Sequence, residues 1–486
     1  MDPPAEALVL DPATCMAFLE PLTHRSPSSD DLPLSAAPRQ LLILEGHGRH
    51  IPTSFVDLST RVTARSDFRR LFPHIVALKA QCESSHCLRA TIHWIIGLGH
   101  SLTSLSLRLP SSATADVQTA ALRAMRGRVP YLQRLEIDAD LRGLTEGQAL
   151  DLALQVVTFC DDLRCLTSLS LPVEILETAW QVHAQAVSGL PLLQELELNT
   201  QTRTALSRRP PTRSGGFNSL HTLRIRGPMF QCADIVGATS RSIKRLDIQC
   251  DFLEETHAIT GTLRSITNYC SASVPCGASR GRSPRGTHGI APANMNALFS
   301  PHGIPSPVRS SDLTDVQLTF TQGSLESAHL RTFAPLLSAH ALRRLSIRYP
   351  YALSYSLDDV GDMLGSWHHI QSLSLNPRPS SGIGSLSTIP SIGILSAVAR
   401  CGPSLRDFHC LVEGFGTCRP LPEHTWAPSL LTLDMGHSLG SCRRYEMQEA
   451  ANYIRDLFRV VDFETEDCSD WVVGVAAVFR ETSCIA

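Results

Sequence analysis

Two six-residue stretches decide the fold of this chain: Leu102-Thr103-Ser104-Leu105-Ser106-Leu107 and Leu132-Gln133-Arg134-Leu135-Glu136-Ile137. Each stretch places an aliphatic residue at its first, fourth and sixth positions. Alternate side chains of an extended strand share a face, so the fourth and sixth residues point to the same side. The residue between them is polar or charged and points to the other side. The pattern therefore predicts a short strand with one buried face and one solvent-facing face.

The same pattern recurs along the chain. Its other copies begin at Leu166, Leu193, Leu220, Ile243, Leu313, Leu342, Ile370, Leu405 and Leu430, with a partial copy at Ile75. Successive copies are 23–35 residues apart, except for one interval of 70 residues. Such intervals are those of leucine-rich repeats, or slightly longer. The sequence thus predicts an α/β leucine-rich-repeat solenoid, in which each repeat buries its apolar face against its neighbours.

Helical patterns lie between the predicted strands. Apolar residues recur at helical spacing in 149–159 and 175–187, and Ser356-Leu357-Asp358-Asp359 reads as a capping box that opens a helix. The segment 391–401 ends at Gly402-Pro403, which is a helix stop signal. Parallel strands joined by helices form a right-handed coil. We therefore expect a horseshoe with strands on its concave face and helices on its convex face.

The repeats depart from the leucine-rich-repeat consensus at one position. Three residues after the last aliphatic residue, that consensus usually has Asn or Cys bonded to the turn backbone. Here the position is occupied by Pro110, Asp140, Glu174, Gln201, Pro228, Asp251, Thr321 and Pro350. We therefore predict irregular repeats without an asparagine ladder.

Composition divides the chain into parts. Residues 1–70 read as an irregular N-terminal segment, 71–437 as the solenoid and 438–486 as a C-terminal capping segment. The 70-residue interval contains 271–311, which is rich in Ser, Pro, Gly and Arg and is predicted to be a disordered insertion. Ser283 precedes Pro284 there, so it is either a phosphorylation site or part of a tolerated surface insertion.

A short additional repeat could precede this insertion. Leu263 and Ile266 have the spacing of the first two motif positions. The sequence leaves open whether they belong to a strand.

Bulk composition narrows the class of protein. The chain has 486 residues, 43% of them hydrophobic, and a net charge of -3, which gives no global attraction to nucleic acid. No run of about 18 apolar residues is present, so no membrane span is expected. The 15 cysteines include no C-x-x-C pair and read as free thiols of the cytosol or nucleus.

Three stretches carry a resemblance to a known family: 71–78 (LFPHIVAL), 450–458 (AANYIRDLF) and 470–473 (DWVV). On these and the long repeats, the chain resembles the fungal F-box/leucine-rich-repeat (RNI-like) proteins over roughly residues 71–480. The resemblance implies that the solenoid holds a substrate for a cullin-RING ubiquitin ligase. It also implies an N-terminal F-box that binds a Skp-type adaptor. Here the expected F-box opening is degenerate or missing, because Leu32-Pro33-Leu34 is soon followed by Pro38.

The concave strand face is the expected binding surface, since solenoids use it to hold partners. Charged residues at its outward positions form acidic and basic bands. The candidate partner-binding residues are Arg134, Glu136, Glu197, Arg224, Arg226, Asp247, Arg344 and Arg348, with Arg245 in the same basic band. Arginine offers a planar fork of donors, so we expect the basic band to bind carboxylates or phosphates of a protein partner.

Three functions remain open. The chain is a substrate receptor of a ubiquitin ligase, a scaffold without a ligase role, or a serine esterase. The esterase alternative rests on Gly436-His437-Ser438-Leu439-Gly440, a G-x-S-x-G motif after a predicted strand. No His follows His437, so the general base would be missing from its usual place in the chain order. We therefore predict a binding protein with no catalytic residues.

Two groups of residues have an imperfect metal-ligand spacing. Cys82 and Cys87 flank His86, and His47 is three residues before His50. No second cysteine pair matches them, as a structural zinc site would require. No metal site, no cofactor and no nucleic-acid partner are expected.

Overall fold

The computed structural model describes most of the chain. The residues it describes are 7–10, 40–44, 53–65, 72, 74–141, 143–175, 187, 189–200, 217, 219–229, 232, 235–236, 243–251, 256–271, 313–322, 328–381, 389–414, 430–440, 442–458 and 461–483. All structural statements below concern these residues.

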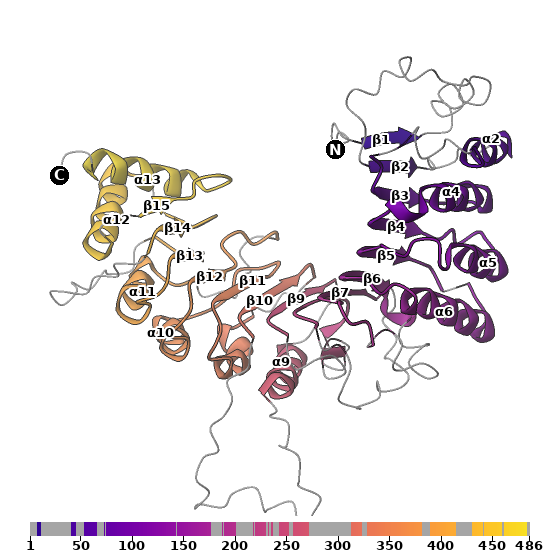
Figure 1. The fold of residues 1–486 in the computed structure, drawn as a ribbon. Helices are drawn as coiled ribbons and strands as arrows, with labels where there is room; N and C mark the ends of the chain where they lie inside the picture. The colour runs from indigo at the N-terminus through magenta and orange to yellow at the C-terminus, as the bar shows by residue number, and fades with distance from the viewer. Residues whose placement is uncertain are drawn as a thin grey trace, which may run out of the picture.

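Within them, fifteen strands form one open sheet in which every strand pairs in parallel with the next strand in sequence. The strands are β1 (Ala7–Leu10), β2 (Gln40–Leu44), β3 (Ala77–Gln81), β4 (Ser104–Arg108), β5 (Arg134–Asp138), β6 (Ser168–Pro172), β7 (Glu195–Asn199), β8 (Thr222–Arg226), β9 (Arg245–Cys250), β10 (Asp315–Phe320), β11 (Arg344–Arg348), β12 (Ser372–Leu375), β13 (Asp407–Cys410), β14 (Thr432–Asp434) and β15 (Asp462–Phe463). This order confirms the predicted α/β leucine-rich-repeat solenoid. Figure 1 shows that the strands line the inner side of a curved body.

Helices cover the outer side of the sheet (Figure 1). They are α2 (Thr53–Thr63), α4 (Ser85–Leu98), α5 (Ala115–Met125), α6 (Glu146–Asp161), α9 (Thr256–Ser271), α10 (Leu357–Ser366), α11 (Leu395–Cys401), α12 (Arg444–Leu457) and α13 (Asp470–Ser483), with 3₁₀ helices η1 (Gly99–Ser101), η2 (Leu330–Ser338) and η3 (Ile392–Ile394). No helix in the described ranges has both the length and the apolar character needed to cross a membrane.

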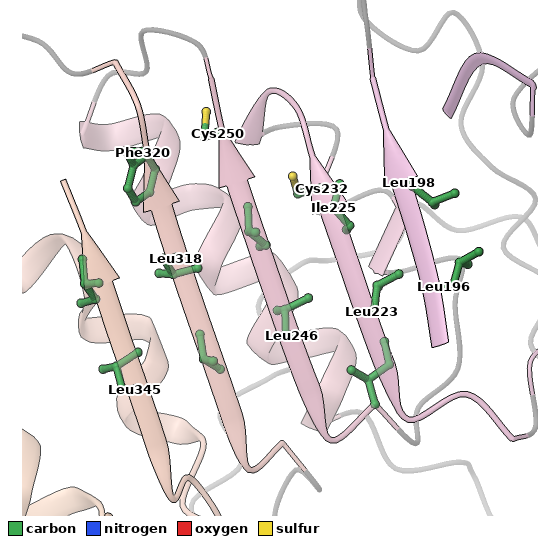
Figure 2. Close-up of a cluster of buried hydrophobic side chains, with 14 of the residues drawn as sticks. Leu196, Leu198, Leu223, Ile225, Cys232, Leu246, Cys250, Leu318, Phe320 and Leu345 are labelled. Atoms are coloured by element: carbon green, nitrogen blue, oxygen red, sulfur yellow. The ribbon is translucent and has the colours of Figure 1, made fainter. Parts of the chain in front are cut away.

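The core follows directly from the repeated motif. The fourth and sixth motif residues of the strands from β3 to β14 are buried, and the residue between them is less buried, as β8 (Leu223 and Ile225 around Arg224) shows. Asp434 of β14 is the exception, because it is itself buried. Figure 2 shows the buried aliphatic side chains side by side on neighbouring strands, with Leu196 and Leu198 on β7, Leu223 and Ile225 on β8, and Leu246 on β9. The first motif residue is also buried, with Leu102 and Leu132 both fully enclosed. Each repeat therefore completes the core of the next.

A row of backbone carbonyls links the turns that precede the strands. The Thr103 carbonyl accepts hydrogen bonds from the amides of Gln133 and Arg134, at 2.8 and 3.0 Å. The same two-amide pattern recurs at each later repeat, from Gln133 to Arg406. This row lies before the strands, whereas the consensus asparagine would follow them, so the row extends the strand pairing and does not replace the asparagine ladder. It explains how degenerate repeats still stack in register.

Most predicted helices are confirmed. Residues 149–159 lie within α6, and the capping box opens α10, where Ser356 and Asp359 cap each other's backbone amides. Residues 391–401 form η3 and α11, which ends before Gly402. The predicted helix at 175–187 lies almost entirely outside the described residues.

The array starts upstream of the predicted boundary at residue 71. Strands β1 and β2 continue the sheet from β3, and α2 packs beside α4. The described parts of residues 1–70, which are 7–10, 40–44 and 53–65, therefore belong to the array. The motif was missed because Pro38 stands where the first aliphatic residue of the β2 copy would be.

The segment 438–486 contributes β15 to the sheet, and its helices α12 and α13 pack together. Its role as a cap stays a prediction. The predicted insertion at 271–311 lies outside the described residues except for Ser271, the last residue of α9. The possible extra repeat is wrong, because Leu263 and Ile266 are buried residues of α9, and β9 pairs directly with β10.

Candidate partner-binding surface

The predicted binding residues all lie on the solvent face of the sheet. Each occupies a strand position that alternates with buried aliphatic residues, as Arg134 and Glu136 alternate with Leu135 and Ile137 in β5. The remaining members lie on β7, β8, β9 and β11. In-register parallel pairing then places them in rows that cross the concave face.

The middle row brings three of them together. Glu197, Arg224 and Asp247 occupy the same register position on β7, β8 and β9. Arg224 Nη1 lies 3.9 Å from Glu197 Oε2, and both side chains are more than 40% exposed. This is a loose, solvated ion pair.

Asp247 is half-buried and lies within electrostatic range of three arginines. Burial raises the pKa of its carboxyl, although the charges of Arg224, Arg245 and Arg348 act in the opposite direction. The charges of these three arginines therefore all act on one carboxylate, and together with it they carry a net positive charge. We call Arg224, Arg245 and Arg348 the central arginine cluster.

Two members of this cluster have spare hydrogen-bonding capacity. Arg245 and Arg348 are exposed, and neither has an ion-pair partner within 4.0 Å among the described residues. A guanidinium carries five N–H donors in a planar fork. The cluster can therefore donate further hydrogen bonds to carboxylate or phosphate oxygens.

Other predicted residues are engaged within the protein. Arg226 donates to Asp251, which also accepts hydrogen bonds from Gln249 and Thr321 at 3.1 Å. Burial opposes ionisation of Asp251, but these hydrogen bonds and the charge of Arg226 hold the pKa of its carboxyl below the usual value. Arg344 lies 3.7 Å from Asp315.

The first two predicted residues lie apart from the cluster. Arg134 and Glu136 are on β5, three strands from β8, a separation of about 14 Å at the usual strand spacing. The predicted residues thus lie in two places, a pair on β5 and a larger group on β7–β11.

A second polar group lies at the C-terminal end of the sheet. His409 and Asp434 share a register position on β13 and β14, and Glu464 directly follows β15. Arg378, three residues after β12, reaches Asp434 with Nη1 at 3.1 Å from Oδ2. We call Arg378, His409, Asp434 and Glu464 the C-terminal polar cluster.

Asp434 is the buried centre of this cluster. Its Oδ1 accepts the Gly436 amide at 2.8 Å, and its Oδ2 lies 3.2 Å from His409 Nδ1. Burial opposes its ionisation, but the hydrogen bonds from His409 and Gly436 and the charge of Arg378 together lower the pKa of its carboxyl. Sequence reasoning did not single out this cluster, because its members are spread over residues 378–464. Aligning the motif copies by register would have revealed it.

Ser438 is not placed as a nucleophile. It is completely buried, and its hydroxyl accepts the Val412 amide at 2.8 Å and donates to the Met435 carbonyl. The glycines of the motif also have packing roles. A Cβ on Gly436 would lie 2.0 Å from the Pro377 carbonyl oxygen, and one on Gly440 would lie 2.3 Å from the Trp471 ring.

The sequence motifs considered for metal are placed as follows. Cys82 and Cys87 are buried, with Cys82 Sγ 3.5 Å from the Thr91 hydroxyl and Cys87 Sγ 4.0 Å from the Gln81 carbonyl. His47, His50 and Ser283 lie outside the described residues.

Comparison with known proteins gives a structural likeness alone. No family model matches the chain, and no curated protein matches it. Among solved structures, the chain is similar to a chain of the Rad7 and Elc1 complex of yeast, with 14% sequence identity and a TM-score of 0.36. The match covers 88% of this chain and 84% of that chain.

Proposed function

We propose that this chain is a non-catalytic binding protein that holds an acidic or phosphorylated protein partner against the central arginine cluster. The observation that carries the proposal is the pair of exposed arginines, Arg245 and Arg348, with no ion-pair partner within 4.0 Å among the described residues. Their charges act on the half-buried Asp247, on a concave face whose curvature suits an extended partner. Arginine forks bind carboxylates and phosphates with paired, directional hydrogen bonds.

Charge reversal tests this proposal. The double variant Arg245→Glu/Arg348→Glu should lose the partners that co-purify with the wild-type chain, measured by quantitative mass spectrometry. The matched control is Arg89→Glu/Arg400→Glu, which makes the same charge change at exposed positions of α4 and α11. Equal recovery of every partner by both variants would refute the site.

The salt dependence of binding gives a second measure. A partner held through ionic contacts should bind more weakly as ionic strength rises, because exposed charges are screened within about 8–10 Å. The affinity of the wild-type chain for a recovered partner should therefore fall with added salt. The double variant should bind weakly at all salt concentrations.

The finer hypothesis is a substrate receptor of a cullin-RING ubiquitin ligase. It is supported by the resemblance to F-box/leucine-rich-repeat proteins. Parts of residues 1–70 are used for β1, β2 and α2, which weighs toward the scaffold without a ligase role. Co-purification of a Skp-type adaptor would favour the receptor, and a partner set lacking one would favour the scaffold.

Placement in the cytosol or nucleus is part of the same proposal. None of the ten cysteines whose side chains the structure describes is in a disulfide, and six of them are buried. Free buried thiols are usual where the compartment is reducing.

A further inference from the structure

Three successive strands of the sheet place potential metal ligands side by side. His409 on β13 is in register with Asp434 on β14. Leu433 is in register with Phe463, so Glu464 is the next residue along and stands beside Asp434. The Glu464 amide donates to the Leu433 carbonyl at 3.1 Å, which continues the strand pairing to this point. The three side chains therefore come from one row of the array.

Their donor atoms converge. His409 Nδ1 lies 3.2 Å from Asp434 Oδ2 and 3.5 Å from Glu464 Oε2, and all three atoms lie within 4.8 Å of one another. One ring nitrogen carries at most one hydrogen, which cannot point along both contacts at once. A metal ion about 2.0–2.2 Å from each donor would hold such atoms about 3–3.6 Å apart. The two distances from Nδ1 fall in that range.

We propose that His409, Asp434 and Glu464 bind a divalent transition-metal ion, with Zn²⁺ as the preferred ion. Imidazole nitrogen favours zinc and its neighbours over Mg²⁺ and Ca²⁺, which take oxygen ligands. Two carboxylates supply the negative charge that balances the ion. The site does not depend on the partner-binding role proposed above.

The surroundings fix Asp434 for this role. Its Oδ1 accepts hydrogen bonds from the Gly436 amide and from Arg378 Nη2, at 2.8 and 3.3 Å, and Arg378 Nη1 lies 3.1 Å from Oδ2. A carboxylate oxygen has two lone pairs, so the ion can take the Oδ2 lone pair that faces His409 while Arg378 stays in its ion pair with the carboxylate. Hydrogen bonds of this kind orient ligands in metal sites. The positive charge of Arg378 lowers the affinity for a cation, which distinguishes this site from a high-affinity structural zinc site.

The site is open on one side. Asp434 is buried, whereas the Glu464 side chain is about half exposed and has the freedom to close on an ion. Three protein ligands leave at least one coordination position of Zn²⁺ for water or for a side chain of a partner. The ion would also join β13, β14 and the segment after β15, and so stabilise the C-terminal end of the array.

Calorimetric titration of the chelator-treated full chain with ZnCl₂ tests the proposal. The wild type should bind one ion, and Glu464→Gln should bind zinc at least about tenfold more weakly. Even the loss of a residue that only hydrogen-bonds a metal ligand lowers metal affinity by about 10–100-fold. Glu464 is exposed, so this variant is expected to fold. The control is Asp462→Asn, an exposed carboxylate on β15 two residues away, which should leave the affinity unchanged. No zinc binding by the wild type, or equal affinity of the two variants, would overturn the proposal.

Cobalt substitution separates this site from binding to free thiols. Cys442 is exposed and Cys468 lies near Asp434, with Sγ 3.7 Å from Oδ1. Co²⁺ at the proposed site should give visible bands without a thiolate charge-transfer band, and these should disappear in His409→Gln. A thiolate band, retained in His409→Gln and lost in Cys442→Ser/Cys468→Ser, would assign the ion to cysteines and overturn the proposal.

Discussion

The centre and the C-terminal end of the concave face use the same strand positions in different ways. On β7–β11 two ion pairs between strands are loose, at 3.9 Å for Arg224–Glu197 and 3.7 Å for Arg344–Asp315, although Arg226 at the end of β8 is hydrogen-bonded to Asp251. At the C-terminal end Asp434 is buried and contacts Arg378 and His409 at 3.1 and 3.2 Å. Exposed pairs contribute little to stability, whereas breaking a buried one is costly.

The cause of this difference lies in what covers each region. Arg378 extends from the end of β12 toward the segment after β15, where its Nη2 donates to the Glu466 carbonyl at 2.8 Å. That segment packs over the end of the sheet and encloses Asp434. No described segment covers the central arginine cluster in this way, so its charges stay accessible to a partner. Burial therefore distinguishes the C-terminal polar cluster from the proposed binding surface, although both use the same register row.

Removing the Asp434 charge should have the largest effect. Asp434→Asn leaves Arg378 with its counter-charge gone, and we expect a loss of about 3 kcal/mol in the free energy of unfolding. Urea denaturation of chelator-treated protein, followed by tryptophan fluorescence, measures this loss. Asp407→Asn on β13 is the control and should change little. If the two variants were equally stable, the cluster would not hold the C-terminal end together.

Adding a methyl group beneath Trp471 should have the next largest effect. In Gly440→Ala the new Cβ would lie 2.3 Å from the buried Trp471 ring, so we expect about 2 kcal/mol of destabilisation by overpacking. Gly361→Ala is the matched control, because nothing lies within 4 Å of its Cβ in α10 and alanine favours helix. The free energy of unfolding of the control, measured by thermal or urea denaturation, should rise by up to about 1 kcal/mol. A neutral Gly440→Ala would mean that the G-x-S-x-G glycines are not required for packing.

The fold could be predicted from sequence because the signal is repeated. Each aliphatic triplet, such as Leu102, Leu105 and Leu107, is weak alone, but the copies impose one register on the whole sheet. The repeat that contains β2 was missed because Pro38 replaces its first aliphatic residue. The other two motif residues, Leu41 and Ile43, are still buried.

The sites were less predictable, because they depend on which charges meet across strands. The sequence identifies the outward positions, so Arg224, Asp247 and Arg348 were predicted to face the partner. It does not show that Asp251 engages Arg226, or that Arg378 reaches Asp434 across 56 residues. Those contacts depend on the lengths of the turns between strands, and the repeat motif does not specify these lengths.

Two aspartates of the central region should respond oppositely to substitution. The pKa of Asp251 is lowered in the folded chain, so its contribution to stability is present above the ordinary value of 3.8 and is lost as the pH falls through the lowered value. The pKa of Asp247 is raised, so its ionisation costs stability as the pH rises above 3.8. At neutral pH Asp251→Asn should destabilise and Asp247→Asn should stabilise, each by less than about 1 kcal/mol after solvent screening. Urea midpoints at pH 7 and pH 3 should show the difference between the variants shrinking in acid, and equal signs at pH 7 would contradict the assignment.

The smallest effect should be in the loose pair at the centre of the face. A double-mutant cycle of Arg224→Ala and Glu197→Ala should give a coupling energy below about 0.5 kcal/mol, because both side chains are solvated at 3.9 Å. The same Arg224→Ala variant should weaken binding of an acidic partner, since the guanidinium is free to leave Glu197. A coupling above about 1 kcal/mol would mean that Arg224 is committed to the protein, as Arg378 is. The distinction between the two regions would then fail at Arg224, a member of the cluster that is proposed to bind the partner.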